Sequence, residues 1–333
     1  MDDHSNCSYH VKLTIAYELD QATIVMLGAI GKTSSSPRAA LLKANPWLGA
    51  DADEVARVFT LPSAVPGGRV AAARRAATLA RLHAGVDAWN GWAATMEALA
   101  GELGQDPAAQ RLWTYLATTD LAGIAVGLQA HDFAALIFPG LADFTAARFA
   151  DPACFSAAIF AGEACFADAG FARGANFERC VFKGAASFAG VSFGRAGEFR
   201  RAEFLGPASF RGAHFAKDAW FRGGHFAAAL DASGASFGGE AGLGDIRYDG
   251  PTSFAKARFG DNAGFEAAVF RDVVRFDDAR FERNARFEQA RFEREPSFDR
   301  ARFLGPTFFQ GIAIPEGSAH VQKAIAELRR RLG

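Results

Sequence analysis

The chain has 333 residues, half of them hydrophobic, and a formal net charge of −1. This composition provides enough apolar material for one large or two ordinary domains and excludes a disordered chain. The four cysteines, Cys7, Cys154, Cys165 and Cys180, form no CxxC or CxxH pair, so the sequence predicts neither a zinc site nor a disulfide framework.

The first 130 residues are expected to form a separate, mostly helical region. It begins with a weak strand signal at residues 11–17 and a Ser-rich linker at Thr33–Pro37. Gly31-Lys32-Thr33 is similar to the end of a phosphate-binding loop, but the first Gly of that motif would fall at Met26, so no cofactor is expected. The most apolar run, residues 22–30, is too short to span a bilayer, and the protein is expected to be soluble and cytoplasmic.

Three helices are predicted after residue 50. Asp51 is a plausible N-cap for a helix that reaches Phe59, and apolar residues continue at helical spacing from Val70 to Leu103. Asp106-Pro107 opens another helix that runs to Leu116. Trp89 and Trp92 are expected to pack these helices against the domain that follows.

From residue 133 onward, phenylalanine recurs at alternating steps of five and six residues. The steps visit 34 positions up to residue 314, and 30 of them are Phe; the exceptions are Ala232, Leu243, Tyr248 and Ile314. The residue two positions before each of these sites is Ala in 21 of the 32 cases from Phe144 onward. Residues two apart on an extended strand point to the same side, so each unit places one small and one large side chain inward.

A short period sustained over about 180 residues predicts a solenoid in which each coil is buried by its neighbours. An exact period of eleven residues excludes a three-sided coil, and a two-sided coil would be too flat to hold Phe. Two periods, with 22 residues and four faces, therefore form one coil, and about eight coils are expected over residues 131–314. Nine ladder residues are chosen as the structural core: Phe144, Phe166, Phe182, Phe188, Phe204, Phe226, Phe259, Phe281 and Phe303.

The repeat resembles the pentapeptide-repeat family, and most closely its Phe-rich branch. The resemblance is carried by units such as Phe177–Phe182 (FERCVF) and Phe281–Phe287 (FERNARF), and it covers residues 131–314. It implies a mainly β, right-handed, four-sided β-helix without enzymatic activity. The chain departs from the family pattern by using Phe rather than Leu and by lengthening every second face by one residue. Trp89–Trp92 (WNGW) is also similar to a stretch that often precedes such repeats.

Residues 315–333 are expected to form a C-terminal helix. Val321, Ile325, Leu328 and Leu332 share one helical face, which suits an end cap for the last coil or the seam of a homodimer.

Outward residues on one face can be compared by taking every twenty-second position. Arg258, Arg280 and Arg302 form such a column, which is either part of an ion-pair lattice with Glu282 or a basic stripe for an acidic partner. Trp220 and Tyr248 are further candidates for partner binding. Residues 227–250 interrupt the ladder and are rich in Gly, so this coil is expected to be the least stable, with a bend or a groove.

Two functions are consistent with these observations. The first is a rigid, non-enzymatic scaffold that binds an unknown protein partner. The alternative is protection of a topoisomerase such as gyrase by mimicry of DNA, which the family resemblance suggests. Residues 131–314 contain 23 acidic and 22 basic residues, whereas a DNA duplex carries one negative charge per about 1.7 Å. The charge balance favours the scaffold and makes nucleic acid an improbable partner.

Overall fold

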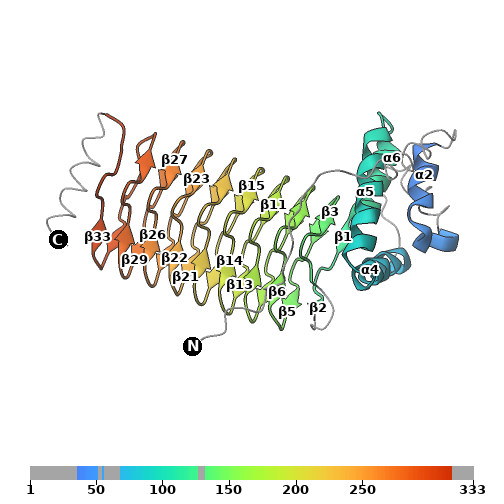
Figure 1. Ribbon diagram of the computed structural model, residues 1–333, viewed down its shortest axis with the longest axis horizontal. Coiled ribbons are helices and arrows are strands. Elements are labelled where there is room, and N and C mark those ends of the chain that lie inside the picture. The colour runs from blue at the N-terminus through green and yellow to red at the C-terminus, as the bar shows by residue number, and fades with distance from the viewer. Residues whose placement is uncertain (1–35, 52–54, 56–67, 127–131, 317–333) are drawn as a thin grey trace.

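The computed structural model describes residues 36–51, 55, 68–126 and 132–316. A group of helices lies at one end of a long rod of stacked coils (Figure 1). The helical elements are α2 (Pro37–Lys43), the 3-10 helix η1 (Pro46–Asp51), α4 (Gly68–His83), α5 (Val86–Glu102) and α6 (Pro107–Ala117).

The start of α2 corrects the linker predicted at Thr33–Pro37. Ser36 is the N-cap of this helix, and its Oγ accepts a hydrogen bond from the amide of Ala39 at 3.4 Å. Pro37 fits the first helical turn because its missing amide hydrogen would have had no partner there. The predicted strand at residues 11–17, the Gly31-Lys32-Thr33 motif and most of the helix predicted from Asp51 to Phe59 lie outside the described residues.

The long helix predicted from Val70 to Leu103 is two helices, α4 and α5. The chain breaks at Gly85, which has a φ of 93° and therefore cannot continue a right-handed helix. The prediction of a helix after Asp106 is confirmed by α6. The Asp106 carboxylate accepts hydrogen bonds from the amides of Ala108 and Ala109, at 2.9 and 3.2 Å.

The rod consists of four parallel sheets of two-residue strands, named here in the order in which the chain visits them. The first sheet contains β1 (Thr119–Asp120), β4 (Ala142–Asp143), β8 (Ala164–Cys165), β12 (Ala186–Ser187), β16 (Ala208–Ser209), β20 (Leu230–Asp231), β24 (Thr252–Ser253) and β28 (Val274–Arg275). The second sheet contains β2 (Ala125–Val126), β5 (Arg148–Phe149), β9 (Gly170–Phe171), β13 (Ser192–Phe193), β17 (His214–Phe215), β21 (Ser236–Phe237), β25 (Arg258–Phe259), β29 (Arg280–Phe281) and β32 (Arg302–Phe303).

The other two sheets complete each coil. The third sheet contains β6 (Ala153–Cys154), β10 (Ala175–Asn176), β14 (Gly197–Glu198), β18 (Ala219–Trp220), β22 (Ala241–Gly242), β26 (Ala263–Gly264), β30 (Ala285–Arg286) and β33 (Thr307–Phe308). The fourth sheet contains β3 (Ile137–Phe138), β7 (Ile159–Phe160), β11 (Val181–Phe182), β15 (Glu203–Phe204), β19 (His225–Phe226), β23 (Arg247–Tyr248), β27 (Val269–Phe270) and β31 (Arg291–Phe292).

The strand register confirms a coil of 22 residues with four faces. Ala142 pairs with Ala164 and Val181 pairs with Glu203, each partner lying 22 residues further along the chain. Sheets of eight or nine strands correspond to about eight coils, as the sequence predicted. The first coil begins at Thr119, so β1 and β2 lie within the region that was assigned to the N-terminal helices.

The ladder residues fill the rod with stacked rings. The centroids of Phe138 and Phe160 lie 4.7 Å apart, with their planes 3° from parallel, and Phe160 and Phe182 repeat this geometry. Rings from opposite sheets meet edge to face, as do Phe144 and Phe155 at 5.4 Å. Eight of the nine chosen core residues are buried, whereas Phe303, in the last coil, is half-buried.

Two of the four corners of each coil require a left-handed backbone conformation. A residue with positive φ recurs every eleven positions from Ala135 to Gly311, and twelve of these residues are not glycine. Such residues are strained because Cβ approaches the backbone. Hydrogen bonds to the next coil hold them in place; for example, the amide of Arg179 donates to the carbonyl of Arg200 at 2.9 Å.

Helix α5 covers the open edge of the first coil. The Trp89 Nε1 donates to the carbonyl of Ile137 at 2.8 Å, and the indole packs edge to face on Phe138. The Asn90 Nδ2 donates to the carbonyl of Ala135 at 3.0 Å, while its Oδ1 accepts from the amide of Ile137 at 2.9 Å. The side chains of α5 thus provide the hydrogen bonds that a preceding strand would supply. The prediction that the tryptophans pack helices onto the first coil is confirmed.

At the other end, the described chain stops at Glu316, so the predicted C-terminal helix lies outside the described residues. Within the described ranges, no helix combines the length and the apolar character needed to cross a bilayer.

Candidate partner-binding surfaces

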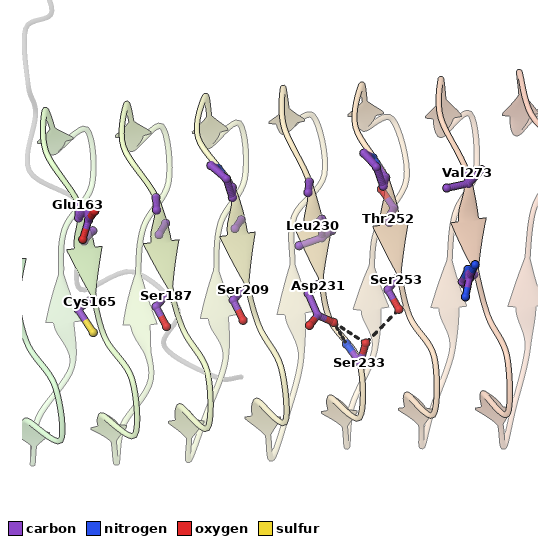
Figure 2. A pocket seen from close by; sticks show the side chains of 18 residues that line it. Glu163, Cys165, Ser187, Ser209, Leu230, Asp231, Ser233, Thr252, Ser253 and Val273 are labelled. Atoms are coloured by element: carbon purple, nitrogen blue, oxygen red, sulfur yellow. Dashed lines mark hydrogen bonds between the residues drawn. The ribbon is translucent and has the colours of Figure 1, made fainter.

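The first sheet presents the most hollowed face of the rod. A groove of about 760 Å³ runs across the strands from β8 to β28 (Figure 2). Its floor is formed by small outward side chains, among them Ser187, Ser209 and Ser253. Pro207 and Pro251 lie along one side. The groove is therefore largely uncharged over its length.

Charged groups are few in this groove. Glu163 and Arg275 lie towards its two ends, and Asp231 lies in the irregular coil. The Asp231 carboxylate accepts hydrogen bonds from the backbone and the hydroxyl of Ser233, and that hydroxyl lies 3.0 Å from the Ser253 hydroxyl (Figure 2). The sequence analysis did not identify this groove, although reading every twenty-second residue from Cys165 would have revealed its row of small side chains.

The second sheet brings Arg258, Arg280 and Arg302 into one outward column, as the register of β25, β29 and β32 requires. Glu282 accepts a hydrogen bond from Arg280 Nε at 2.6 Å and lies 3.1 Å from Arg258 Nη2. The hydrogen bond from Arg280 lowers the pKa of the Glu282 carboxyl. Two of the three candidate arginines are thus held in an ion-pair lattice, and Arg302 is exposed at its end.

The ion-pair lattice extends over the C-terminal half of the rod. Arg286 Nε lies 2.9 Å from Glu266, and Arg300 Nε donates to Asp278 at 2.7 Å. That hydrogen bond also lowers the pKa of Asp278. These groups are largely exposed, so each pair contributes little to stability, but together they interleave the two signs of charge along the surface.

Trp220 is the outward residue of β18, and its side chain is half-buried. The indole lies over the outward position of the next coil, where a Cβ on Gly242 would come within 2.5 Å of its Cε3. The guanidinium of Arg200 lies 5.0 Å from the ring centroid. Trp220 is therefore a surface residue whose position depends on the absence of a side chain at Gly242.

Tyr248 does not belong to a surface and is withdrawn as a partner-binding candidate. It is the inward residue of β23, completely buried, and its ring stacks between Phe226 and Phe270 at 5.4 and 4.5 Å. Its hydroxyl has no hydrogen-bond partner, and burial raises its pKa. The sequence already placed it on the ladder, where inward orientation follows from strand periodicity.

The irregular coil at residues 227–250 is paired without interruption. Strands β20 to β23 keep the register of their neighbours on both sides, so no break accompanies the weakened ladder. The groove that crosses this coil extends over six strands of the first sheet and is not confined to it. Leu230 and Ile246 are buried at positions that elsewhere hold Ala, which offsets the smaller Ala232 and Leu243.

No group of three or more metal-binding side chains occurs in the part of the chain that the structure describes. The outward charged residues discussed above form ion pairs and do not converge on one atom. The geometry of the rod is therefore that of extended surfaces held on a rigid core.

Comparison with known proteins gives one family. The model for pentapeptide repeats (9 copies) matches residues 177–225 and 265–312. The unmatched stretch between them contains the irregular coil, and the regular coils before residue 177 are also unmatched. Neither the curated proteins nor the solved structures contain a significant match to the chain.

Four parallel sheets and a 22-residue register define the rod as a quadrilateral β-solenoid. With the repeat match at 177–225 and 265–312, the chain is identified as a pentapeptide-repeat protein.

Proposed function

We propose that this protein is a non-enzymatic scaffold that binds a protein partner along the outer faces of its rod. The observation that carries the proposal is the contrast between core and surface. The inward positions repeat Phe and Ala almost without change, whereas the outward positions give a neutral groove on the first sheet and interleaved charges on the second. A rigid core that keeps outward side chains at a fixed spacing of about 4.8 Å suits recognition of another macromolecule.

The alternative of DNA mimicry lacks this support. An imitation of a duplex needs an uninterrupted acidic surface, whereas Arg258, Arg280 and Arg300 lie among the carboxylates of the rod. We also propose a cytoplasmic location, because the spacing of the four cysteines suggests no disulfide framework.

The proposal is tested by cross-linking the full chain to its partner in the cells that produce it. The wild type is compared with four folded variants, each altered on one face: Ser209→Arg, His214→Glu, Trp220→Ala and Arg291→Glu. We expect a cross-linked protein that one of these variants no longer captures. If no protein is captured, or if all four variants capture the same proteins to the same extent, the faces of the rod are not a binding surface.

A further inference from the structure

A second hollow lies at the corner where the third sheet turns into the fourth. It has a volume of about 370 Å³, and it is lined by Arg200, Arg201, Arg222, Gly223 and two carboxylate residues, Glu178 and Asp245. Three arginines from two neighbouring coils therefore converge on one depression of the surface. Arg201 and Arg222 are exposed to solvent.

Each carboxylate around this hollow already has an arginine partner. Arg222 Nε donates to Asp245 at 2.6 Å, and Arg179 Nε lies 3.7 Å from Glu178. Glu198, next to the hollow, is paired with Arg200, whose guanidinium also lies over the Trp220 ring. Four arginines thus face three carboxylates.

Arg201 is the arginine that remains. No ion pair involves its side chain among the described residues, and its position in the coil explains why. Along this corner Arg201 lies between Arg179, which has the same charge, and Gly223, which has no side chain. The Cγ of Arg201 would lie 3.4 Å from a Cβ built on Gly223, so the arginine side chain extends over the glycine.

Another corner shows how such an arginine is satisfied within the rod. Arg300 and Asp278 both have positive φ and lie one coil apart, and the Arg300 guanidinium donates to both carboxylate oxygens of Asp278, at 2.7 and 2.9 Å. At Arg201 the position one coil further on is Gly223, so the corresponding carboxylate is missing. The guanidinium can therefore accept a bidentate carboxylate from outside the chain.

We propose that the hollow around Arg201 binds an acidic side chain, Asp or Glu, of a partner protein. Charge complementarity favours this occupant, because the four arginines and three carboxylates leave one positive charge in the depression. Arg200 and Arg222 are held in place by their ion pairs and form the sides of the site. This inference rests on the proposed scaffold function, and it specifies the chemistry that one corner of the rod recognises.

The test measures binding of a fluorescently labelled hexaglutamate peptide to the full chain by anisotropy at low ionic strength, with a hexalysine peptide for comparison. We expect hexaglutamate to bind more tightly than hexalysine, and Arg201→Gln to weaken its binding about tenfold, the loss expected for one charge-assisted contact. Gly223→Asp should cause a similar loss, because it supplies Arg201 with an internal carboxylate. Asp is tolerated at this corner position, as Asp245 demonstrates with a φ of 54°.

Arg211→Gln is the matched control, because it removes the same charge from an exposed arginine ten residues away on a different corner. If Arg211→Gln weakens binding as much as Arg201→Gln does, the peptide senses net charge and the site is refuted. Equal binding of the wild type and Arg201→Gln also refutes it. A cellular partner that Arg201→Gln still captures would leave the scaffold function intact and remove only this site, whereas peptide binding without any cellular partner would remove the scaffold function alone.

Discussion

Inward and outward side chains alternate along each strand, so the effect of a substitution in the rod depends on which side of the strand it alters. Phe182 is fully buried in the fourth sheet, with rings of the adjacent coils stacked on both of its faces. Arg179, three residues earlier, is an exposed corner residue with a φ of 58°. The two positions provide a direct comparison of the two environments.

Phe182→Asp is expected to unfold the rod, because it buries an unpaired charge and removes a ring from a continuous stack. Arg179→Asp should change the melting temperature little, since its side chain faces solvent and Asp tolerates positive φ. Thermal denaturation followed by circular dichroism measures both. Equal stability of the two variants would contradict the assignment of inward positions.

The buried hydroxyl of Tyr248 leads to a second prediction at this scale. Because that hydroxyl has no hydrogen-bond partner, Tyr248→Phe should leave the free energy of unfolding unchanged or raise it. Phe182→Tyr, in the same ring stack, should lower it by about 1 to 3 kcal/mol, since it buries a new unpaired hydroxyl in a regular coil. Chemical denaturation provides both values. A loss of stability in Tyr248→Phe would indicate a partner for the hydroxyl.

At the residue scale, the sequence predicted the side chains of the core but not the backbone of the corners. The Phe ladder is readable because inward positions demand one kind of residue. The left-handed corners hold Ala146, Arg201 and Lys256 as well as glycine, and these residue types do not signal positive φ. Their conformation is imposed by hydrogen bonds between coils, which are tertiary and leave no local pattern in the sequence.

The elements of the helical end illustrate the same limit. Gly85 lies within an otherwise helical pattern, and the break between α4 and α5 at this residue was not predicted. A single Gly lowers helix propensity by only about 1 kcal/mol, so the pattern alone does not decide between a continuous helix and a turn. The packing of α5 on the first coil fixes the turn.

Asn90 is the residue of α5 that most resembles a strand partner. Asn90→Ala should leave the amide of Ile137 and the carbonyl of Ala135 without their side-chain partner and cost about 1 kcal/mol. Hydrogen exchange at the Ile137 amide should become faster, while Glu97→Gln, an exposed change on the same helix, should have no effect. Unchanged exchange in Asn90→Ala would show that Trp89 alone holds the helix on the coil.

The irregular coil remains the predicted weak element of the rod, even though its strands are in register. Ala232 and Leu243 interrupt the ring stacks of the first and third sheets, and each lost aromatic pair removes about 0.5 to 1.5 kcal/mol beyond its buried area. Amides at residues 232–248 should therefore exchange faster than those at 270–290. Equal protection of the two segments would mean that Leu230 and Ile246 compensate fully.

For the whole molecule, the charges and the ends of the rod matter more than any single coil. The sequence predicted the balance of charge and the Arg258–Arg302 column, because a fixed 22-residue coil makes outward neighbours calculable. It did not predict the groove on the first sheet or the hollow at Arg201, because these depend on side chains that are missing or small at neighbouring corners, such as Gly223.

The two ends of the rod are treated differently, and the last prediction concerns the C-terminal one. Helix α5 covers the first coil, whereas in the last described coil Phe298 and Phe303 are only half-buried, and β32 and β33 have an unpaired edge. Exposed strand edges and apolar rings favour association. Residues 318–333, whose sequence predicts an amphipathic helix, are the segment of this chain next to that edge. Deleting them should either cause the rods to associate end to end or convert a dimer to a monomer, and light scattering measures the mass in both cases. A truncated protein with unchanged mass and solubility would show that this segment neither caps the rod nor joins two copies of it.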